Sequence, residues 1–402
     1  MGVKWTEEQQ KVIQLRNRNI LVSAAAGSGK TAVLVERIIS RITDEKHPVD
    51  VDHLLIVTYT DAAAREMKER IGAAIEKKLE ERPGDLHLEQ QATLVHSASI
   101  TTTHSFCLSV IRDHFHVIGI DPGFRIAEEG ELRLLKQDVL EELLEQSYAA
   151  GEEEFLEFVE KYGTGRNDHK IEGIILQLYE YSRSYPQPDR WLDECVEKYD
   201  LDMDHLDDAA ILKESEARIR ERLQGVRRFL ELAMQKAEEP AGPYMYGEML
   251  ESDLVQLEKV EQAQNYLELE ARIRAFEWKR LSAKKDDSVD PDLKETVKEL
   301  RNTAKKLLGK IREQYFYVSV AEMVRDMQDS VDVMQTLTGL VRQFTEMLDA
   351  KKRQRNMIDF SDMEQFALQI LTEEKDGELV PSQVAKEYQE QFEEVMVDEY
   401  QD

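Results

Sequence analysis

A run of small residues close to the N-terminus ends in a lysine and a threonine. The segment Ala24-Ala25-Ala26-Gly27-Ser28-Gly29-Lys30-Thr31 has the spacing of a phosphate-binding loop. Small residues let the backbone curl so that successive N–H groups point at one phosphate, and the following helix adds its partial positive charge. We expect Lys30 to hold the β- and γ-phosphates and Thr31 to ligate Mg²⁺. The alternative is a small-residue loop that binds nothing.

Two adjacent carboxylates, Asp398 and Glu399, follow the apolar run Val395–Val397 near the other end of the chain. In parallel α/β sheets the ligand lies at the carboxyl ends of the strands. Beside a phosphate-binding loop, Asp398 is expected to hold Mg²⁺ and Glu399 to orient and deprotonate the attacking water. Gln401 is a candidate link between the nucleotide state and the rest of the protein. Alone, such acids are usually solvated turn residues.

Short apolar runs rich in β-branched residues predict the buried strands that must position these groups. The predicted strands are Ile20–Ser23, Leu54–Thr58, Ser99–Thr102 and Val395–Val397. Helical patterns follow the first three, at Lys30–Arg41, Ala62–Glu81 and His104–His116. This alternation indicates βαβ units and a parallel sheet covered on both faces.

The pattern changes after Asp121-Pro122-Gly123, and apolar residues then recur at three- and four-residue intervals among dense charges. This region, about 125–355, predicts an all-helical domain. Because the last strand pattern resembles the first three, we expect an α/β fold whose sheet domain, residues 1–124 and 356–402, is interrupted by the helical insert.

Composition limits the possible partners and the environment. The net charge of −29 argues against a globally attractive surface for DNA or an anionic membrane, so any DNA must bind a local patch. The two cysteines, Cys107 and Cys195, suggest neither a disulfide framework nor a zinc site. We find no pattern typical of a membrane span or signal peptide, and expect a cytoplasmic protein with no membrane partner.

One helical segment of the insert has a basic pattern against this acidic background. Lys294, Lys298, Arg301 and Lys305 follow one another at four-, three- and four-residue steps, which predicts a cationic stripe on a helix. Such a stripe suits the phosphates of duplex DNA. The alternative is a solvated face paired with neighbouring acids such as Glu295 and Glu299.

Taken together, these motifs resemble those of superfamily 1A helicases of the UvrD/Rep/RecB type. The family's second motif, D-E-x-Q-D, corresponds to Asp398-Glu399-Tyr400-Gln401-Asp402. Trp5-Thr6-Glu7-Glu8-Gln9 resembles its Q motif, which implies that Gln9 reads the adenine of ATP. The resemblance implies a RecA-like sheet domain, called 1A, with a helical insert, called 1B, and ATP and Mg²⁺ as cofactors.

Two further segments resemble motifs with which this family grips single-stranded DNA. Thr58-Tyr59-Thr60-Asp61-Ala62 resembles motif Ia, and Thr101-Thr102-Thr103-His104-Ser105 resembles motif Ib. The resemblance implies DNA contacts by Thr58, Tyr59, Thr60, Thr102, His104 and Ser105. Asp61-Ala62 replaces the usual Asn-Lys, which puts a direct phosphate contact there in doubt, and Thr103 replaces an aromatic residue. A helix cap and ordinary core packing are the alternatives.

The segments Gly119–Ile126 and Met357–Met363 resemble most closely the A subunits of bacterial AddAB helicase–nucleases. This implies ATP-dependent unwinding and resection of DNA ends in double-strand-break repair, with a second helicase–nuclease chain as partner. Because the chain ends within the second motif, we expect it to retain half of the nucleotide site, with little ATPase and no helicase activity. The rival interpretations are a UvrD/Rep-type repair helicase, a non-DNA ATPase or kinase, and a bare binding module.

Overall fold

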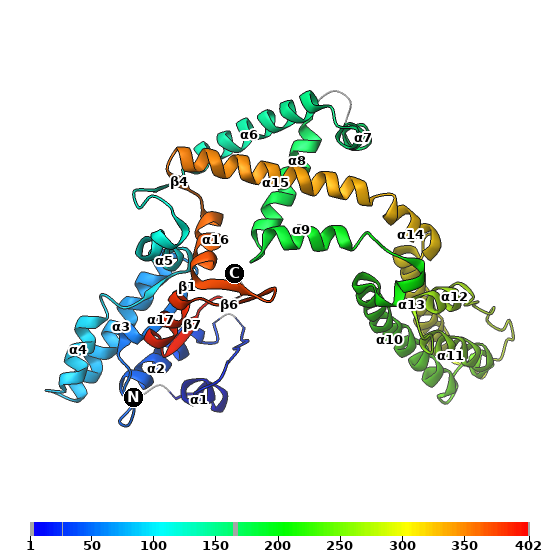
Figure 1. Cartoon of the computed structure of the whole chain (residues 1–402). Coiled ribbons are helices and arrows are strands. Elements are labelled where there is room, and N and C mark those ends of the chain that lie inside the picture. The colour runs from blue at the N-terminus through cyan, green and yellow to red at the C-terminus, as the bar shows by residue number, and fades with distance from the viewer. Residues whose placement is uncertain (1–3, 26, 164–167, 401–402) are drawn as a thin grey trace. The chain divides into compact units, whose positions relative to one another are not determined.

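The structure, a computed structural model, describes residues 4–25, 27–163 and 168–400 (Figure 1). The chain divides into two compact units. Unit 1 comprises residues 1–139 and 346–402, and unit 2 comprises residues 140–345.

A small parallel sheet forms the centre of unit 1. Its strands are β1 (Leu54–Thr58), β2 (Ile100–Thr102) and β7 (Glu394–Val397), in the order β2-β1-β7. Thr58 pairs with Thr102 on one side of β1, and Val57 pairs with Val397 on the other. Every residue of β1 is buried, as expected for a parallel strand covered on both faces. Three of the four predicted strands are thereby confirmed.

The predicted strand Ile20–Ser23 is wrong. Within the described residues this segment has no strand hydrogen bonds, and Leu21 and Val22 are 82% and 44% exposed. An apolar run becomes a strand only when a neighbour supplies hydrogen bonds and covers its side chains. The sequence of the run alone does not reveal that no such neighbour pairs with it in this structure.

The three helices that the sequence predicts in unit 1 are all present in the structure. They are α2 (Lys30–Ile42), α3 (Asp61–Glu81) and α5 (Thr103–Ile118), joined by α1 (Glu7–Gln14), α4 (Leu86–Leu94), α16 (Phe360–Leu371) and α17 (Gln383–Gln391). One apolar cluster packs α2 and α3 against Leu54 and Ile56 of β1. A second cluster joins α5 to α16, which lie side by side in Figure 1.

Short strands complete unit 1. The two-residue strands β3 (Arg125–Ile126) and β4 (Met357–Ile358) pair in parallel, and β5 (Thr372–Lys375) pairs antiparallel with β6 (Glu378–Pro381). Helices α6 (Glu129–Ala150) and α15 (Val331–Gln354) run through the limits of the two units. These limits therefore differ from those predicted at 124 and 355, because a change of sequence pattern does not mark a division inside a continuous helix.

Unit 2 is helical, as its sequence pattern predicts. Its remaining helices are α7 (Glu153–Tyr162), α8 (His169–Arg183), α9 (Pro188–Glu197), α10 (Ala210–Glu238), α11 (Gly247–Glu261), α12 (Tyr266–Arg274), α13 (Pro291–Tyr315) and α14 (Val320–Gln328). Long helices α10 and α13 pack together, and both contribute to one large apolar cluster. No helix among the described residues of the chain is long and apolar enough to span a membrane.

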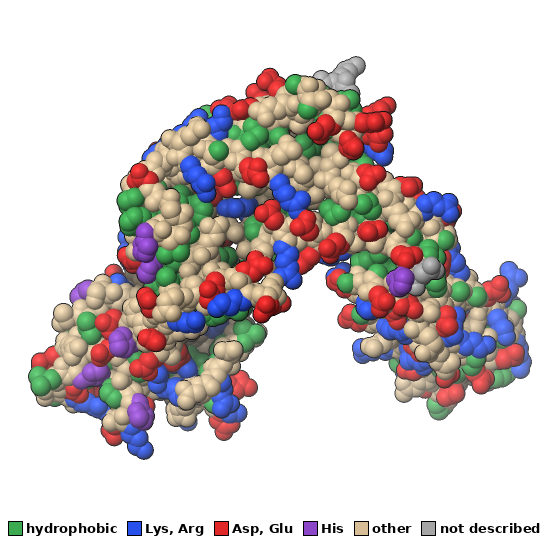
Figure 2. Space-filling view, in the orientation of Figure 1, with side chains coloured by type: hydrophobic (Ala, Val, Ile, Leu, Met, Phe, Trp, Pro, Cys, Tyr) green, Lys and Arg blue, Asp and Glu red, His purple; other side chains and the backbone are tan. Residues whose placement is uncertain are grey.

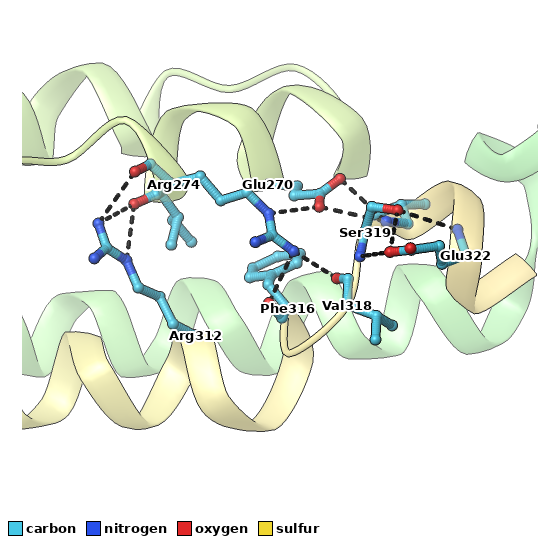
Figure 3. Close-up of polar contacts among 9 residues, drawn as sticks. Glu270, Arg274, Arg312, Phe316, Val318, Ser319 and Glu322 are labelled. Carbon is cyan, nitrogen blue, oxygen red and sulfur yellow. Dashed lines mark hydrogen bonds and ion pairs between the residues drawn. The ribbon is translucent and has the colours of Figure 1, made fainter.

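Two arginines hold the helix ends of unit 2 together (Figure 3). Arg312 of α13 donates to the carbonyls of Ile273 and Phe276 at the end of α12, at 3.0 and 2.7 Å. Arg274 of α12 donates in return to the carbonyl of Phe316, 2.9 Å away, where α13 ends. The last carbonyls of a helix lack partners within the helix, so each arginine satisfies groups of the other helix.

The structure corrects the predicted basic stripe on α13. Arg301 is only 8% exposed, and its Nε lies 2.6 Å from a carboxylate oxygen of Asp253 on α11, which is fully buried. Arg301 lies on the same helix face as Val297 and Ala304, which are also buried. The prediction of a four-residue solvent-exposed stripe is therefore wrong, because a charged residue with a buried partner can belong to the core. Lys298 pairs with Glu295 at 2.8 Å.

Candidate active site

The predicted phosphate-binding loop leads directly into the N-terminus of α2. Gly29 is the residue before the helix and has a φ of 83°, and Gly27 has a φ of 76°, both in the region that favours glycine. The backbone N–H of Ser28 donates to the carbonyl of Ala25 at 3.2 Å. Lys30 Nζ lies 3.4 Å from the carbonyl oxygen of Ala24. This leaves the N–H groups of the first turn of α2 available to an anion.

Gln9 contacts this loop from helix α1. Its Nε2 donates to the carbonyl of Ser28 at 3.2 Å, and its Oε1 accepts from the backbone N–H of Thr6 at 2.9 Å. The Thr6 hydroxyl in turn accepts from the backbone N–H of Gln9, so the two residues form a capping box at the start of α1. This cap fixes the start of α1, and the side-chain amide of Gln9 lies against the predicted phosphate loop.

Arginines on α2 attach the helix to strand β7. Arg37 Nε lies 2.5 Å from Glu394 Oε1, and the two side chains are 9% and 18% exposed. One turn further on, Arg41 Nη2 lies 3.0 Å from Glu393 Oε2. These pairs link the helix after the loop to the strand that leads to Asp398. The sequence interpretation did not include them, because nothing local in the sequence connects residues so far apart along the chain.

Asp398 continues the path of β7, and its backbone N–H donates to the carbonyl of Val57 at 2.8 Å. Burial, and next the charge of Glu399, raise the pKa of the Asp398 carboxyl, while the charge of Lys30 opposes this shift. Lys30 and Asp398, from opposite ends of the chain, are thus close enough to interact electrostatically. Glu399 adopts a φ of 55°, a left-handed conformation uncommon for a residue with a side chain.

The parallel sheet brings the predicted motifs to one edge. Because β1, β2 and β7 all run in the same direction, Thr58, Thr102 and Asp398 lie at the same ends of adjacent strands. The strand register pairs Thr58 directly with Thr102. This carboxyl edge, defined by Thr58–Thr60, Thr102–Ser105 and Asp398–Glu399, is where α/β sheets bind their ligands.

The hydroxyls of the predicted DNA-binding residues have different surroundings. Thr58 is 2% exposed and its Oγ1 donates to the carbonyl of Thr60, whereas Thr60 caps α3 by accepting from the amide of Ala63. Tyr59 lies between them with its side chain 65% exposed. The two threonines therefore shape the turn, and Tyr59 presents its ring to solvent.

The second predicted DNA segment begins helix α5. Thr102 is the N-cap and accepts from the backbone N–H of Ser105 at 3.2 Å, and its Oγ1 donates to Ser105 Oγ at 2.9 Å. Thr102, which caps the helix, is buried, with only 8% of its surface exposed. Ser105 is exposed to solvent. His104 Nε2 lies 3.0 Å from Glu364 Oε1, with both side chains partly exposed.

An exposed aromatic residue, Phe360, lies beside this segment and was not among the predicted site residues. Its ring is 59% exposed and contacts the ring of His104 edge-on, with centroids 5.2 Å apart. Phe360 begins α16 directly after the capping residue Asp359. The signal in the sequence is this aromatic residue between acids in Asp359-Phe360-Ser361-Asp362, which carried a family resemblance but no periodic pattern.

A buried ion cluster holds Phe360 in place. Lys352 of α15 lies 2.7 Å from Asp362 and 3.3 Å from Asp359, and all three residues are at most 4% exposed. Asp359 and Asp362 also form the capping box of α16. Burial raises the pKa of Asp362, with Lys352 opposing it. The cluster anchors the helix start, so the exposed ring of Phe360 follows from a fixed backbone.

Three predicted site residues or motif ends, Ala26, Gln401 and Asp402, lie outside the described residues. The remaining donor set fits Mg²⁺ chemically, with the Asp398 carboxylate and the Thr31 hydroxyl as oxygen ligands. Mg²⁺ is commonly held by one or two protein groups together with phosphate oxygens and water. The raised pKa of Asp398 also fits a carboxylate whose charge a cation would stabilise.

Comparison with known proteins agrees with these motifs. Residues 5–402 match the family model of the UvrD/REP helicase N-terminal domain. The chain is 47% identical, over 99% of its length, to the AddA-type ATP-dependent helicase/nuclease chain of Lachnoclostridium phytofermentans. It is 44% identical, over its whole length, to the protein of the same name from Geobacillus thermodenitrificans. The chain therefore belongs to the UvrD/REP helicase family.

The curated relatives are much longer than this chain. It covers 29% of the Lachnoclostridium protein and 33% of the Geobacillus protein. A Bacillus licheniformis relative, 43% identical and of the same name, is also covered to 33%. The match thus extends over about a third of the length of these proteins, and family membership rests on this part.

Proposed function

We propose that the chain is the ATP-binding part of an ATP-dependent DNA helicase/nuclease that unwinds and resects DNA ends in recombinational double-strand-break repair. Unit 1 is assigned as the RecA-like domain 1A and the helical unit as its insert 1B, in a protein of the bacterial cytoplasm. The family match and the names of the relatives support this proposal. The observation that carries it is geometric: the Arg37–Glu394 ion pair attaches the helix that begins at Lys30 to the strand that leads to Asp398 at the carboxyl edge.

Each part of the proposed ATP site has a distinct task. The backbone of residues 24–31 surrounds the phosphates, Lys30 neutralises the β- and γ-phosphates, and Gln9 reads the adenine edge. Thr31 and Asp398 would hold Mg²⁺, which would supply charge that stabilises the triphosphate. Glu399 orients and deprotonates the attacking water, and Gln401 transmits the nucleotide state.

The contact of Gln9 with the loop suggests how adenine and phosphate recognition are linked. Its Nε2 is used by the Ser28 carbonyl and its Oε1 by Thr6. An adenine that takes over these hydrogen bonds releases the loop carbonyl while binding. ATP would then alter the loop from the base as well as from the phosphates.

Single-stranded DNA is proposed to bind the exposed groups of the carboxyl edge. Tyr59 and Phe360 offer aromatic faces for stacking, while Thr60, His104 and Ser105 offer polar groups to the backbone. The buried hydroxyls of Thr58 and Thr102 support these positions from below. Figure 2 shows acidic and basic side chains interspersed over the visible face, which fits a local DNA contact better than a globally basic one.

The remaining partners are proposed from the relatives alone. The relatives are named as subunits, and we propose that the whole protein assembles with a second helicase–nuclease chain. Binding of duplex DNA to the helical unit stays a prediction. Because Arg301 is buried, fewer basic groups of α13 are left to contact such a duplex.

Fluorescence anisotropy with a labelled single-stranded oligonucleotide tests the proposal. The chain is expected to bind DNA, and a non-hydrolysable ATP analogue with Mg²⁺ is expected to change the affinity about fivefold or more. Lys30→Ala removes the nucleotide effect and leaves basal DNA binding, whereas Lys46→Ala, on an exposed loop, changes neither. No DNA binding in either state favours a non-DNA ATPase or kinase, and binding indifferent to nucleotide favours a bare binding module.

A further inference from the structure

A pocket of about 320 Å³ lies between α5 and α17 in unit 1. Its walls include the rings of Phe106 on α5 and of Tyr388 and Phe392 at the end of α17. Tyr388 and Phe392 are stacked, with 6° between their planes, and Phe106 meets them edge-on at 68° and 62°. The His114 ring also meets Tyr388 edge-on. The rings form a partial aromatic box whose π faces are rich in electron density.

Carboxylates line the same pocket. Asp113 and Glu387 are both exposed, and among the described residues neither forms an ion pair. The pKa of Tyr388 is raised first by its burial and then by the charges of Asp113 and Glu387, so both carboxylates lie within electrostatic reach of its hydroxyl. No lysine or arginine is among the residues described as lining the pocket. The pocket therefore favours a positive charge.

The combination of aromatic faces, unpaired carboxylates and small volume selects a particular kind of ligand. A guanidinium group stacks on aromatic rings and accepts two carboxylate contacts through its planar fork, which an ammonium group does less well. The volume lies at the lower end of the range for small-molecule pockets, which suits one side chain. A free amino acid would need a cation for its carboxylate, and the described lining offers none.

We propose that this pocket binds an arginine side chain presented by a partner protein. The guanidinium stacks on the Tyr388 or Phe392 ring, and the carboxylates of Asp113 and Glu387 hold its charge. The pocket lies toward the edge of the sheet opposite to the carboxyl edge, since α17 ends just before β7 begins and the lining residue Ser99 directly precedes β2. The proposal concerns an interaction surface and does not depend on the assigned helicase activity.

Nuclear magnetic resonance of the full 402-residue chain, with selectively labelled tyrosine and phenylalanine rings, tests this inference. The probe is N-acetyl-arginine amide, and its neutral isostere N-acetyl-citrulline amide is the control. We expect the arginine probe to shift the Tyr388 and Phe392 ring signals with a dissociation constant on the order of 10 mM, and the citrulline probe to shift them far less. Equal shifts from both probes, or none from arginine, would overturn the proposal.

Charge variants provide the second arm of the experiment. The double variant Asp113→Asn/Glu387→Gln is expected to weaken arginine binding about threefold or more, because it removes both carboxylates but keeps the rings. Glu390→Gln, on α17 but outside the pocket lining, is the matched control and should leave binding unchanged. All substituted side chains are exposed, so the variants are expected to fold. Unchanged ring spectra in the absence of the probe would verify this. Arginine binding unaffected by the double variant would contradict the assigned pocket.

Discussion

At the scale of the single residue, Asp398 is held in an environment that opposes its charge. Its carboxyl is partly buried next to Glu399, and both effects raise its pKa, with Lys30 only partly compensating. A charged group kept at such a position is costly for folding unless a ligand compensates it. Carboxyls with such a raised pKa are common at functional sites. The Asp398 charge is therefore expected to favour ligand binding and to disfavour folding.

Asp398→Asn is therefore expected to keep or raise thermal stability at pH 7 while weakening Mg²⁺-dependent ATP-analogue binding. A carboxyl with a raised folded-state pKa favours folding below its unfolded pKa of about 3.9, and this contribution is lost as the pH rises through the folded-state value. The advantage of the variant should accordingly disappear toward pH 4. Thermal melts between pH 4 and pH 8 measure it, and a variant much less stable than the wild type at pH 7 would contradict the assigned environment.

Phe360 provides a second test at this scale. Phe360→Ala is expected to weaken single-stranded DNA binding by about fivefold or more, because stacking of one base contributes on the order of 1–3 kcal/mol. Anisotropy titrations measure the change, with Tyr317→Ala as the control because that ring is 70% exposed in unit 2. Phe360→Trp should retain binding. Equal losses in Phe360→Ala and Tyr317→Ala would show that exposed rings act nonspecifically.

At the scale of the elements, the attachment of α2 to β7 decides whether the phosphate loop faces Asp398. Arg37→Met leaves the partly buried Glu394 without its shortest ion pair, and is expected to destabilise α2 by on the order of 3 kcal/mol. Amide hydrogen exchange of α2 measures this opening free energy. Arg70→Met, in the exposed pair with Glu66, should change it by less than about 0.5 kcal/mol. Similar exchange in both variants would rule out a structural role for the Arg37 pair.

The buried pair in unit 2 makes a separate prediction. Burial raises the pKa of Asp253 although Arg301 lowers it, so Arg301→Met should destabilise unit 2 by about 3–5 kcal/mol at pH 7. The loss should shrink toward pH 4, where a neutral Asp253 is favoured. Asp253→Leu/Arg301→Met together should be nearly neutral, since no unpaired charge remains. Urea unfolding measures these effects, with Arg218→Met in an exposed pair as the control.

At the scale of the whole molecule, the sequence predicts those elements whose pattern reflects burial on both sides. Leu54–Thr58 is a continuous apolar run because the strand is covered on both faces, and it is predicted with its observed limits. The helices after it follow from amphipathic spacing, and the structure adds Thr60 as the cap of α3. Similarly, the order of the motifs along the chain indicates the carboxyl edge that the parallel strands create.

What the sequence does not predict depends on partners far away in the chain. Ile20–Ser23 has strand-like composition but no neighbouring strand among the described residues, and Arg301 has surface-like chemistry but a buried partner in Asp253. The ion pair between Arg37 and Glu394 was not predicted for the same reason, because its two residues lie far apart in the sequence. Phe360 was missed because one exposed aromatic residue has no periodicity, and only its contact with His104 marks it.

If Lys30 and Asp398 act on one bound metal–triphosphate, their contributions to its binding must be coupled. A double-mutant cycle on the affinity for an ATP analogue with Mg²⁺, measured by titration calorimetry, determines this coupling. The four proteins are the wild type, Lys30→Ala, Asp398→Asn and the double variant. Groups in one network couple by about 0.5–3 kcal/mol, so we expect losses of affinity that are clearly not additive. Additive losses, or full affinity in Asp398→Asn, would contradict a shared site.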